Sequence, residues 1–569
     1  ADVQTSSVQS AGIRVERTFN TSTQEISYDV AGQTTTMAYD ENGLVTSIDR
    51  PGDQSDFSFA YDDAGRLSES RAWTDGAERV WSYGFDDEGL LDSLSDAAGK
   101  TRALSYDLSG RIQSISWPGN QATALVYDAN GNVLAVKAGA LSLASVAYNA
   151  INRLDIVGTA GTAGYRQIAY DKDRFISGVS SDDGLVSVTH NSAGFVSALS
   201  DVDGATWSAT YEKDGRIPGL AAPSGMTTTY PFDGPLLTEV AWDTEVAGTV
   251  SFTYDDALRA SGIAVNAGTP IAYGFGPVGE LASVGDLTML TDVATGQLDE
   301  LDLGVTKEQR FYNGFGELSL REVWAGTTLL WSEELEVDVA GRIVSRMESV
   351  ASGDPRLTLV TYDAAGRLSG ITQDGSDVGS FTYDARGNKT GSGIVVNASD
   401  QLTQASGGSF TYDVAGHRAS KVVGGVTTST SYDALGNLTQ VEQTGAGTIT
   451  YVVAGMNQRV GKKVGGVLTQ GFLYLDNVHP IAELDGTGAV VKAFVYSGDS
   501  ETPAYFLDAA GKSYRMVRDG VGSVRLVIDT ETGEVVQELD YDAWGKIVVD
   551  TNPVFQPFGF GGMLYDADT

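Results

Sequence analysis

A short motif recurs along nearly the whole chain and limits what the chain can fold into. An aromatic residue, usually Tyr, is followed by Asp, two variable residues and Gly. Neighbouring copies are often 21 residues apart, as Tyr106 and Tyr127 are. A period of this length is typical of arrays in which neighbours complete one another's core. Strict copies begin at Tyr28, Tyr39, Tyr61, Phe85, Tyr106, Tyr127, Tyr362, Tyr383, Tyr412, Tyr432 and Tyr541, and relaxed copies lie between residues 148 and 338.

Each repeat predicts a β-hairpin. Residues 357–362 are rich in β-branched and aromatic side chains, which suit a pleated strand. Asp363 can accept backbone N–H groups within the turn, and Gly366 suits a left-handed position. A second short strand follows, and the two strands with their connection fill the period. We expect a structural turn at Tyr61, Asp62, Gly65; Tyr106, Asp107, Gly110; Tyr127, Asp128, Gly131; Tyr362, Asp363, Gly366; Tyr383, Asp384, Gly387; Tyr412, Asp413, Gly416; Tyr432, Asp433, Gly436; and Tyr541, Asp542, Gly545.

The apolar residues after the turn do not alternate strictly. Pairs such as Val45 and Ile48, or Leu368 and Ile371, are three residues apart, whereas strand alternation needs two or four. Either a β-bulge or a sheet that is apolar on both faces explains this spacing. The best helical stretch, residues 306–324, is interrupted by glycines, so we expect a nearly all-β chain.

Three architectures can use such repeats. A propeller with two repeats per blade would need about a dozen blades, above the usual range of about 4–8. A parallel β-helix does not require turns that reverse the strand, which argues against it. The remaining choice is a long antiparallel sheet that twists and curls into a spiral around a cavity. The predicted fold class is therefore all-β, with antiparallel hairpin repeats spiralling into a hollow shell.

Composition excludes several classes of function. The chain has 75 acidic and 37 basic residues, a formal net charge of −38. Such a chain repels phosphate backbones and anionic membranes, so we expect neither a nucleic-acid partner nor membrane insertion. It has no Cys and only His190, His417 and His479, which are far apart in the sequence. We therefore expect no metal and no cofactor.

Other motifs carry little chemistry. Asp201-Val-Asp203-Gly204 has only the first ligands of a calcium loop. Residues 520–524 lack the Gly-Lys-Ser/Thr of a phosphate loop and the complete Gly-x-Ser-x-Gly of a nucleophile elbow. Residues 559–562 are glycine-rich, but no helix is expected after them. The recurring Tyr side chains could line a surface for a glycan or an unfolded peptide, although packing between strands explains them better.

The repeat resembles the YD repeat of bacterial Rhs proteins, of the BC component of insecticidal Tc toxins and of animal teneurins. The likeness covers about residues 28–569, and it is strongest in the last third, which is similar to the Rhs-associated core. The matching segments there are Phe472–Tyr474, Pro480–Gly488, Val517–Val524, Asp529–Gly533, Tyr541–Gly545 and Phe558–Asp566.

This resemblance implies a β-cocoon. In toxin members the cocoon encloses a C-terminal polypeptide that is released by aspartyl autoproteolysis, and in teneurins the closed shell is an adhesion scaffold. We expect an N-terminal lead-in at 1–27, a YD-repeat spiral at 28–470, and a core-like part at 471–569 that stops before the expected autoproteolysis motif. The cleavage residues and the cargo would then lie outside this chain.

The expected function is a non-enzymatic encapsulating shell of a bacterial, secreted or surface-exposed polymorphic-toxin protein that acts as a monomer. Its partner would be an enclosed C-terminal polypeptide cargo. The alternative is a teneurin-like extracellular scaffold that binds a cell-surface protein or glycan through its outer face. A glycan-processing enzyme would need two carboxylates about 5–10 Å apart in a deep cleft, and the sequence gives no sign of one.

Overall fold

The fold is described here from a computed structural model. It covers residues 3–10, 13–30, 32–52, 54–74, 76–119, 121–139, 141–159, 165–181, 184–277, 279–292, 295–351, 353–498 and 500–569. These residues form β-strands from β1 (Val3–Ser10) to β56 (Ile547–Asp550), joined by short turns. Within these ranges the one helical element is a 3₁₀ turn, η1 (Phe560–Gly562), and no helix could cross a lipid bilayer.

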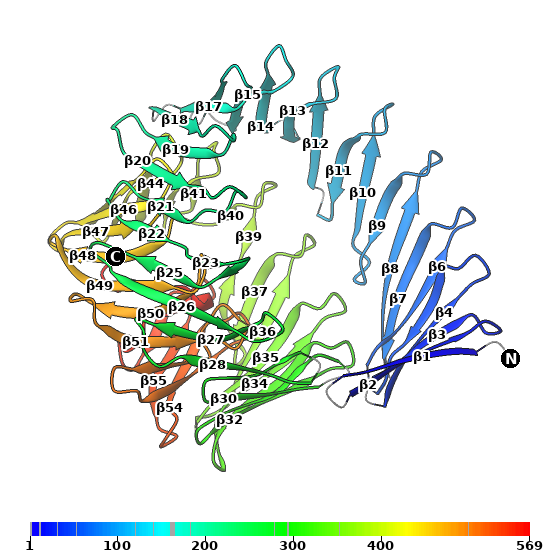
Figure 1. The fold of residues 1–569 in the computed structure, drawn as a ribbon. Helices are drawn as coiled ribbons and strands as arrows, with labels where there is room; N and C mark the ends of the chain where they lie inside the picture. Colours follow the sequence, from blue (N-terminus) through cyan, green and yellow to red (C-terminus); the bar gives the residue numbers. More distant parts are fainter. Residues whose placement is uncertain are drawn as a thin grey trace. The chain divides into compact units, whose positions relative to one another are not determined.

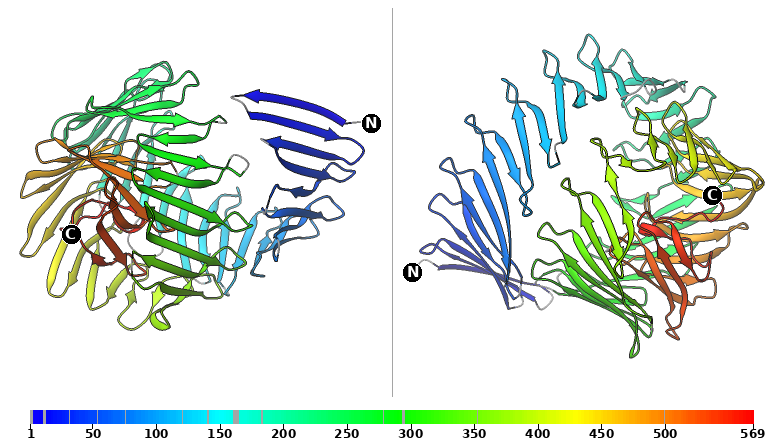
Figure 2. Two further views of the ribbon diagram at one scale, coloured as in Figure 1. Left: turned by 90° about the horizontal axis from the view of Figure 1, so that it is seen from below. Right: turned by 180° about the vertical axis from the view of Figure 1, so that it is seen from behind.

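Consecutive strands pair in antiparallel hairpins (Figure 1). For example, β36 (Arg356–Tyr362) pairs with β37 (Leu368–Gln373), which pairs with β38 (Ser376–Ser380). The two further views in Figure 2 show the same hairpins along the chain, from blue to red. In the strict copies from Tyr39 onward, the aromatic residue lies at the end of a strand, directly before the turn, whereas Tyr28 lies within β3 (Glu25–Val30).

The three-residue spacing of the apolar side chains is caused by a β-bulge. Tyr362 pairs with Leu368 and Thr361 pairs with Gly370, so Ser369 is an extra residue on the second strand. The bulge brings Leu368 and Ile371 onto one face, although they are three positions apart. The same register shift occurs after the turns that begin at Tyr39, Phe85 and Tyr106. The bulge alternative from the sequence is therefore confirmed.

The chain forms two compact units. The first contains residues 1–124, 274–385 and 528–535. One face of its sheet buries a charged network on β33 (Leu318–Ala325), β34 (Thr328–Val337), β35 (Ile343–Val350) and β36. Arg321 donates to Glu333 at 2.8 Å, and Arg346 donates to the other oxygen of Glu333 at 2.7 Å. Since Arg321 and Glu333 are only 4% and 1% exposed, the pairing offsets the cost of burying their charges.

The second unit contains residues 125–273, 386–527 and 536–569. In this unit β26 (Gly248–Tyr254) contacts β49 (Val467–Tyr474), so two stretches of sheet pack face to face (Figure 1). Val250, Trp242 and Met226 from one stretch are buried in the same core as Leu473 and Ile481 from the other. A second aromatic core, around Phe494, Phe506 and Phe558, lies in the last part of the unit.

The predicted boundaries at 27/28 and 470/471 stay a prediction. Within the lead-in, β2 (Ile13–Asn20) pairs with β3 (Glu25–Val30), while residues 1, 2, 11 and 12 lie outside the described residues. At the other boundary, β49 pairs with both β48 (Arg459–Val464) and β50 (Pro480–Asp485).

Candidate functional site

The feature that recurs most often in this chain is the turn itself. At Asp363 the backbone N–H donates to the carbonyl of Arg367 at 2.8 Å, and the N–H of Gly366 donates to the carbonyl of Asp363 at 3.0 Å. Gly366 has a φ of +83°, a left-handed conformation that glycine adopts without strain. The same pair of backbone hydrogen bonds closes the turns at Asp62, Asp107, Asp128, Asp413, Asp433 and Asp542. At Gly387, in the remaining copy of the eight, φ is +91°.

The Asp side chain stabilises the turn by accepting hydrogen bonds from backbone N–H groups within it. In the turn that follows Tyr61, Oδ1 of Asp62 accepts the N–H of Ala64 at 3.0 Å and that of Arg66 at 2.9 Å. These bonds favour the charged carboxylate, and the bond from the Arg66 N–H has the largest effect in holding the pKa of Asp62 below its usual value. Side-chain hydrogen bonds from Arg111 and Asn132 are the largest causes that lower the pKa of Asp107 and Asp128.

The Tyr hydroxyl connects one repeat to the repeat before it. Tyr383 donates from its hydroxyl to the carbonyl of Leu368 at 2.8 Å, and Tyr362 donates to the carbonyl of Ile343 at 2.7 Å. Leu368 is the residue that directly precedes the bulge of the previous hairpin. The same bond joins Tyr61 to Val45, Tyr106 to Leu91, Tyr412 to Leu402 and Tyr432 to Arg418. This explains the use of Tyr rather than Phe, because only Tyr has this donor.

In many repeats, the residue after the Gly contacts the aromatic ring of the repeat that follows. The guanidinium of Arg367 lies 4.6 Å from the centre of the Tyr383 ring, and that of Arg342 lies 4.5 Å from the Tyr362 ring. Where this residue is aromatic, it stacks in the same way, as in Phe195 on Tyr211 and His417 on Tyr432. Sequence reasoning did not assign this role, although the recurrence of Arg, Asn, Phe or His after the Gly was a signal for it.

The calcium-loop-like segment at Asp201, the histidines and the relaxed copies also take part in turns or in ring and ion-pair contacts. Oδ1 of Asp201 accepts the N–H of Asp203 and of Ala205, as Asp does in the other turns. His190 stacks on Phe175, and His479 lies between the carboxylates of Asp476 and Glu501. Non-glycine residues with positive φ occupy the Gly position in relaxed copies, for example Leu258 at +62°.

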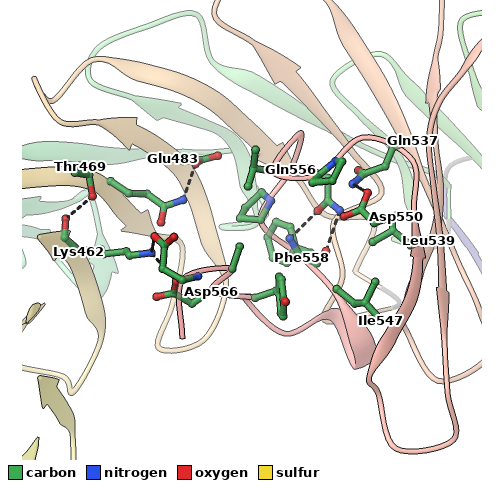
Figure 3. A pocket seen from close by; sticks show the side chains of 17 residues that line it. Lys462, Thr469, Glu483, Gln537, Leu539, Ile547, Asp550, Gln556, Phe558 and Asp566 are labelled. Carbon is green, nitrogen blue, oxygen red and sulfur yellow. Dashed lines mark hydrogen bonds and ion pairs between the residues drawn. The ribbon is translucent and has the colours of Figure 1, made fainter. Parts of the chain in front are cut away.

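A cavity of about 540 Å³ lies in the second unit, between the C-terminal segment and the strands that it covers (Figure 3). The strands are β48, β49, β50, β55 (Val535–Tyr541) and β56. Most of the polar lining residues are acidic or amide side chains. The residues that line the cavity are Lys462, Thr469, Gln470, Glu483, Gln537, Leu539, Ile547, Asp550, Pro553, Val554, Gln556, Pro557, Phe558, Tyr565, Asp566, Ala567 and Asp568.

Asp566 fixes the C-terminal segment against the sheet. The Tyr451 hydroxyl donates to its Oδ2 at 2.7 Å, and Lys462 donates to its Oδ1 (Figure 3). Burial alone would raise the pKa of Asp566, but the hydrogen bonds from Lys462 and Tyr451 oppose this effect, and the net pKa lies below the usual value. Burial and the hydrogen bond to Asp566 raise the pKa of Tyr451.

Comparison with known proteins places these features in a family. The model of the Teneurin YD-shell family matches residues 15–569. Among curated proteins, the tRNA3(Ser)-specific nuclease WapA of Bacillus spizizenii is 29% identical over 224 residues, which cover 37% of this chain and 9% of WapA. Teneurin-4 of Homo sapiens is 22% identical over 277 residues, 46% of this chain and 10% of the teneurin. The chain thus spans about a tenth or less of the length of these relatives.

Solved structures agree on the fold. The crystal structure of TcdB2-TccC3-TEV matches 98% of this chain and 36% of the solved chain, with a TM-score of 0.67 at 12% identity. The crystal structure of TcdB2-TccC3 matches the same shares with a TM-score of 0.62 at 13% identity. The resemblance inferred from the sequence and the predicted all-β YD-shell fold are both confirmed, and the chain is a shell scaffold. This chain belongs to the Teneurin YD-shell family.

Proposed function

We propose that this chain is a non-enzymatic encapsulating shell that encloses or shields a polypeptide cargo. The observation that carries the proposal is the connection between consecutive turns. In many repeats the Tyr hydroxyl donates to a carbonyl beside the bulge of the previous hairpin, as in Tyr383, and the residue after the Gly lies against the next aromatic ring, as in Arg367. Such bonds suit a continuous wall better than a row of independent hairpins.

A wall of this kind suits containment. Its backbone donors and acceptors are used within the antiparallel ladder, so it offers few free groups with which an unfolded chain could form further strands. The cargo would be a polypeptide attached to the protein, of the kind that YD-repeat toxins carry, and the protein would be exported from a bacterium to the cell surface or beyond. The scaffold would then protect the cargo from proteases until release.

Protease protection tests this function. An unfolded polypeptide of ~100 residues with many trypsin sites would be fused after Thr569, and the same polypeptide would be fused to an unrelated folded domain as the control. If the shell encloses its cargo, trypsin should cleave the polypeptide at least about tenfold more slowly in the shell fusion than in the control. Equal rates of cleavage in the two fusions would contradict encapsulation.

A teneurin-like adhesion scaffold is the second candidate, supported by the teneurin relatives and by the family to which the chain belongs. In that case the outer surface would bind a cell-surface protein or glycan. Saturable binding of the purified, labelled chain to intact cells, combined with full cleavage of the fused polypeptide, would favour adhesion over encapsulation.

A further inference from the structure

The C-terminal cavity is lined by both apolar and polar side chains, a combination that suits a binding site. Leu539, Ile547 and Phe558 form an apolar part of its lining, and carboxylates and amides form the polar part. Its volume of about 540 Å³ lies within the range of cavities that bind small ligands. In Figure 3 the pair of Lys462 and Asp566 and the pair of Gln537 and Asp550 lie at opposite ends of the view.

The charges in the lining do not cancel. Glu483, Asp550, Asp566 and Asp568 are acidic, whereas Lys462 is the one basic residue in the lining. Lys462 is already paired with both Asp566 and Asp568. Lys492, from outside the lining, pairs with Glu483 at 2.8 Å. Within the part of the chain that the structure describes, Asp550 has no cationic partner, and its Oδ1 accepts only from the amide of Gln537 and the backbone N–H of Asn552.

Beside this carboxylate lies an acceptor without a donor. The Gln537 side chain is almost completely buried, with 1% of its surface exposed. Its Nε2 donates to Asp550 at 2.9 Å and to the carbonyl of Asn552 at 3.0 Å. Its Oε1 is buried and accepts no hydrogen bond from the described residues. A buried carbonyl oxygen without a donor is costly, so this oxygen and the Asp550 carboxylate together favour a ligand that donates hydrogen bonds and carries positive charge.

We propose that the cavity binds a guanidinium or ammonium group, in the form of an Arg or Lys side chain of a polypeptide. The cationic head would lie near Asp550 and Gln537, where it supplies both the missing charge and the missing donor. The aliphatic stem would contact the apolar lining, as the stems of these side chains do elsewhere. This apolar part favours a side chain on a peptide over a free polyamine, whose charges are spaced along its whole length. The proposal does not depend on encapsulation, because it rests on the lining of the cavity and not on a cargo inside the shell.

Titration calorimetry with the purified full chain tests the site. The first probe is the capped tripeptide acetyl-Gly-Arg-Gly-amide, and its uncharged isostere carries citrulline in place of arginine. We expect the arginine peptide to bind with a Kd in the millimolar range and the citrulline peptide to bind at least about tenfold more weakly, since a charged hydrogen bond is worth about one power of ten or more. Equal binding of the two peptides, or no detectable binding of either, would overturn the proposal.

Two variants and one further probe locate the site and identify the source of the charge. Asp550→Asn keeps the acceptor for Gln537 and Asn552 and removes the charge, whereas Asp63→Asn makes the same change at an exposed turn position in the other unit. Asp550→Asn should weaken the binding of the arginine peptide about tenfold, and Asp63→Asn should leave its affinity unchanged. An unchanged affinity in Asp550→Asn would place the binding elsewhere. Agmatine, a free guanidinium amine, should bind more weakly than the peptide, and equal binding would refute the polypeptide as the occupant.

Discussion

Replacing Gly366 by Val should destabilise the hairpin of β36 and β37 by about 1–3 kcal/mol. The φ of Gly366 is +83°, and an L-residue held in this region costs about 1–2 kcal/mol, more for a β-branched side chain. A Cβ at this position would lie 3.3 Å from Nη1 of Arg342 and 3.8 Å from Nζ of Lys100. The first contact requires Arg342 to move by a few tenths of an ångström, which adds a small cost. The lower entropy of Val in the unfolded chain offsets roughly 0.5–1 kcal/mol.

Two companion variants separate the backbone from the contacts. At Gly387 φ is +91°, and a Cβ there has no heavy atom within 4 Å, so Gly387→Val should show the backbone cost alone. Leu258 is a non-glycine residue with a φ of +62° and is largely exposed, so Leu258→Gly should be neutral or should stabilise its turn by up to about 1 kcal/mol.

Hydrogen exchange followed by mass spectrometry is the suitable assay, because a chain of many repeats need not unfold in one step. The amides of β36 and β37 should exchange faster in Gly366→Val, and the melting temperature should fall. If both exchange and melting temperature were unchanged in Gly366→Val, the left-handed turn would not be the source of local stability, and this reasoning would be wrong.

The remaining predictions concern the hydroxyl, the turn carboxylate and the C-terminal anchor. Tyr383→Phe should lower the free energy of unfolding by about 0.5–1.5 kcal/mol, because the hydrogen bond to the carbonyl of Leu368 is lost. Tyr541→Phe should change it little, since the Tyr541 hydroxyl is buried without a hydrogen-bond partner in the described structure. Chemical denaturation of both variants checks this. Asp363→Ala should raise hydrogen exchange in its turn, with a cost on the order of 1 kcal/mol, and unchanged exchange would contradict it. Asp566 has a pKa below its usual value, so its contribution to stability is fully present above about pH 4 and is lost as the pH falls through the folded pKa. The difference in unfolding free energy between the wild type and Asp566→Asn should therefore be present at pH 7 and should shrink in acid, and a difference independent of pH would contradict the role of the charge.

The sequence was informative wherever one repeat determines its own conformation. Tyr362, Asp363 and Gly366 indicated a hairpin because turn chemistry acts over a few residues. The spacing of Leu368 and Ile371 left two explanations, a β-bulge or a sheet that is apolar on both faces. Pairing resolved that choice in favour of the bulge. The motif could also have indicated the bonds between repeats, because Tyr was preferred to Phe at a position where packing alone does not distinguish them.

Features that join distant parts of the sequence could not be predicted. No local pattern shows that Val250 and Leu473 are buried in one core, since each belongs to an ordinary strand. From the sequence, Arg321 and Glu333 would be expected to be exposed charges on neighbouring strands, whereas the structure buries them as an ion pair. The cavity beside Asp550 is formed by residues from 462 to 568 that are far apart in the sequence, and no local pattern shows that they line one cavity.

The central claim is that the connected hairpins form a wall around a polypeptide. Cryo-electron microscopy of the chain with an unfolded polypeptide fused after Thr569 tests it most directly. The account predicts a β wall that surrounds a chamber. The additional density of the fused polypeptide should lie inside this chamber and not on the outer surface of the wall. A wall without an internal chamber, or fused polypeptide that is found only outside the wall, would contradict the account.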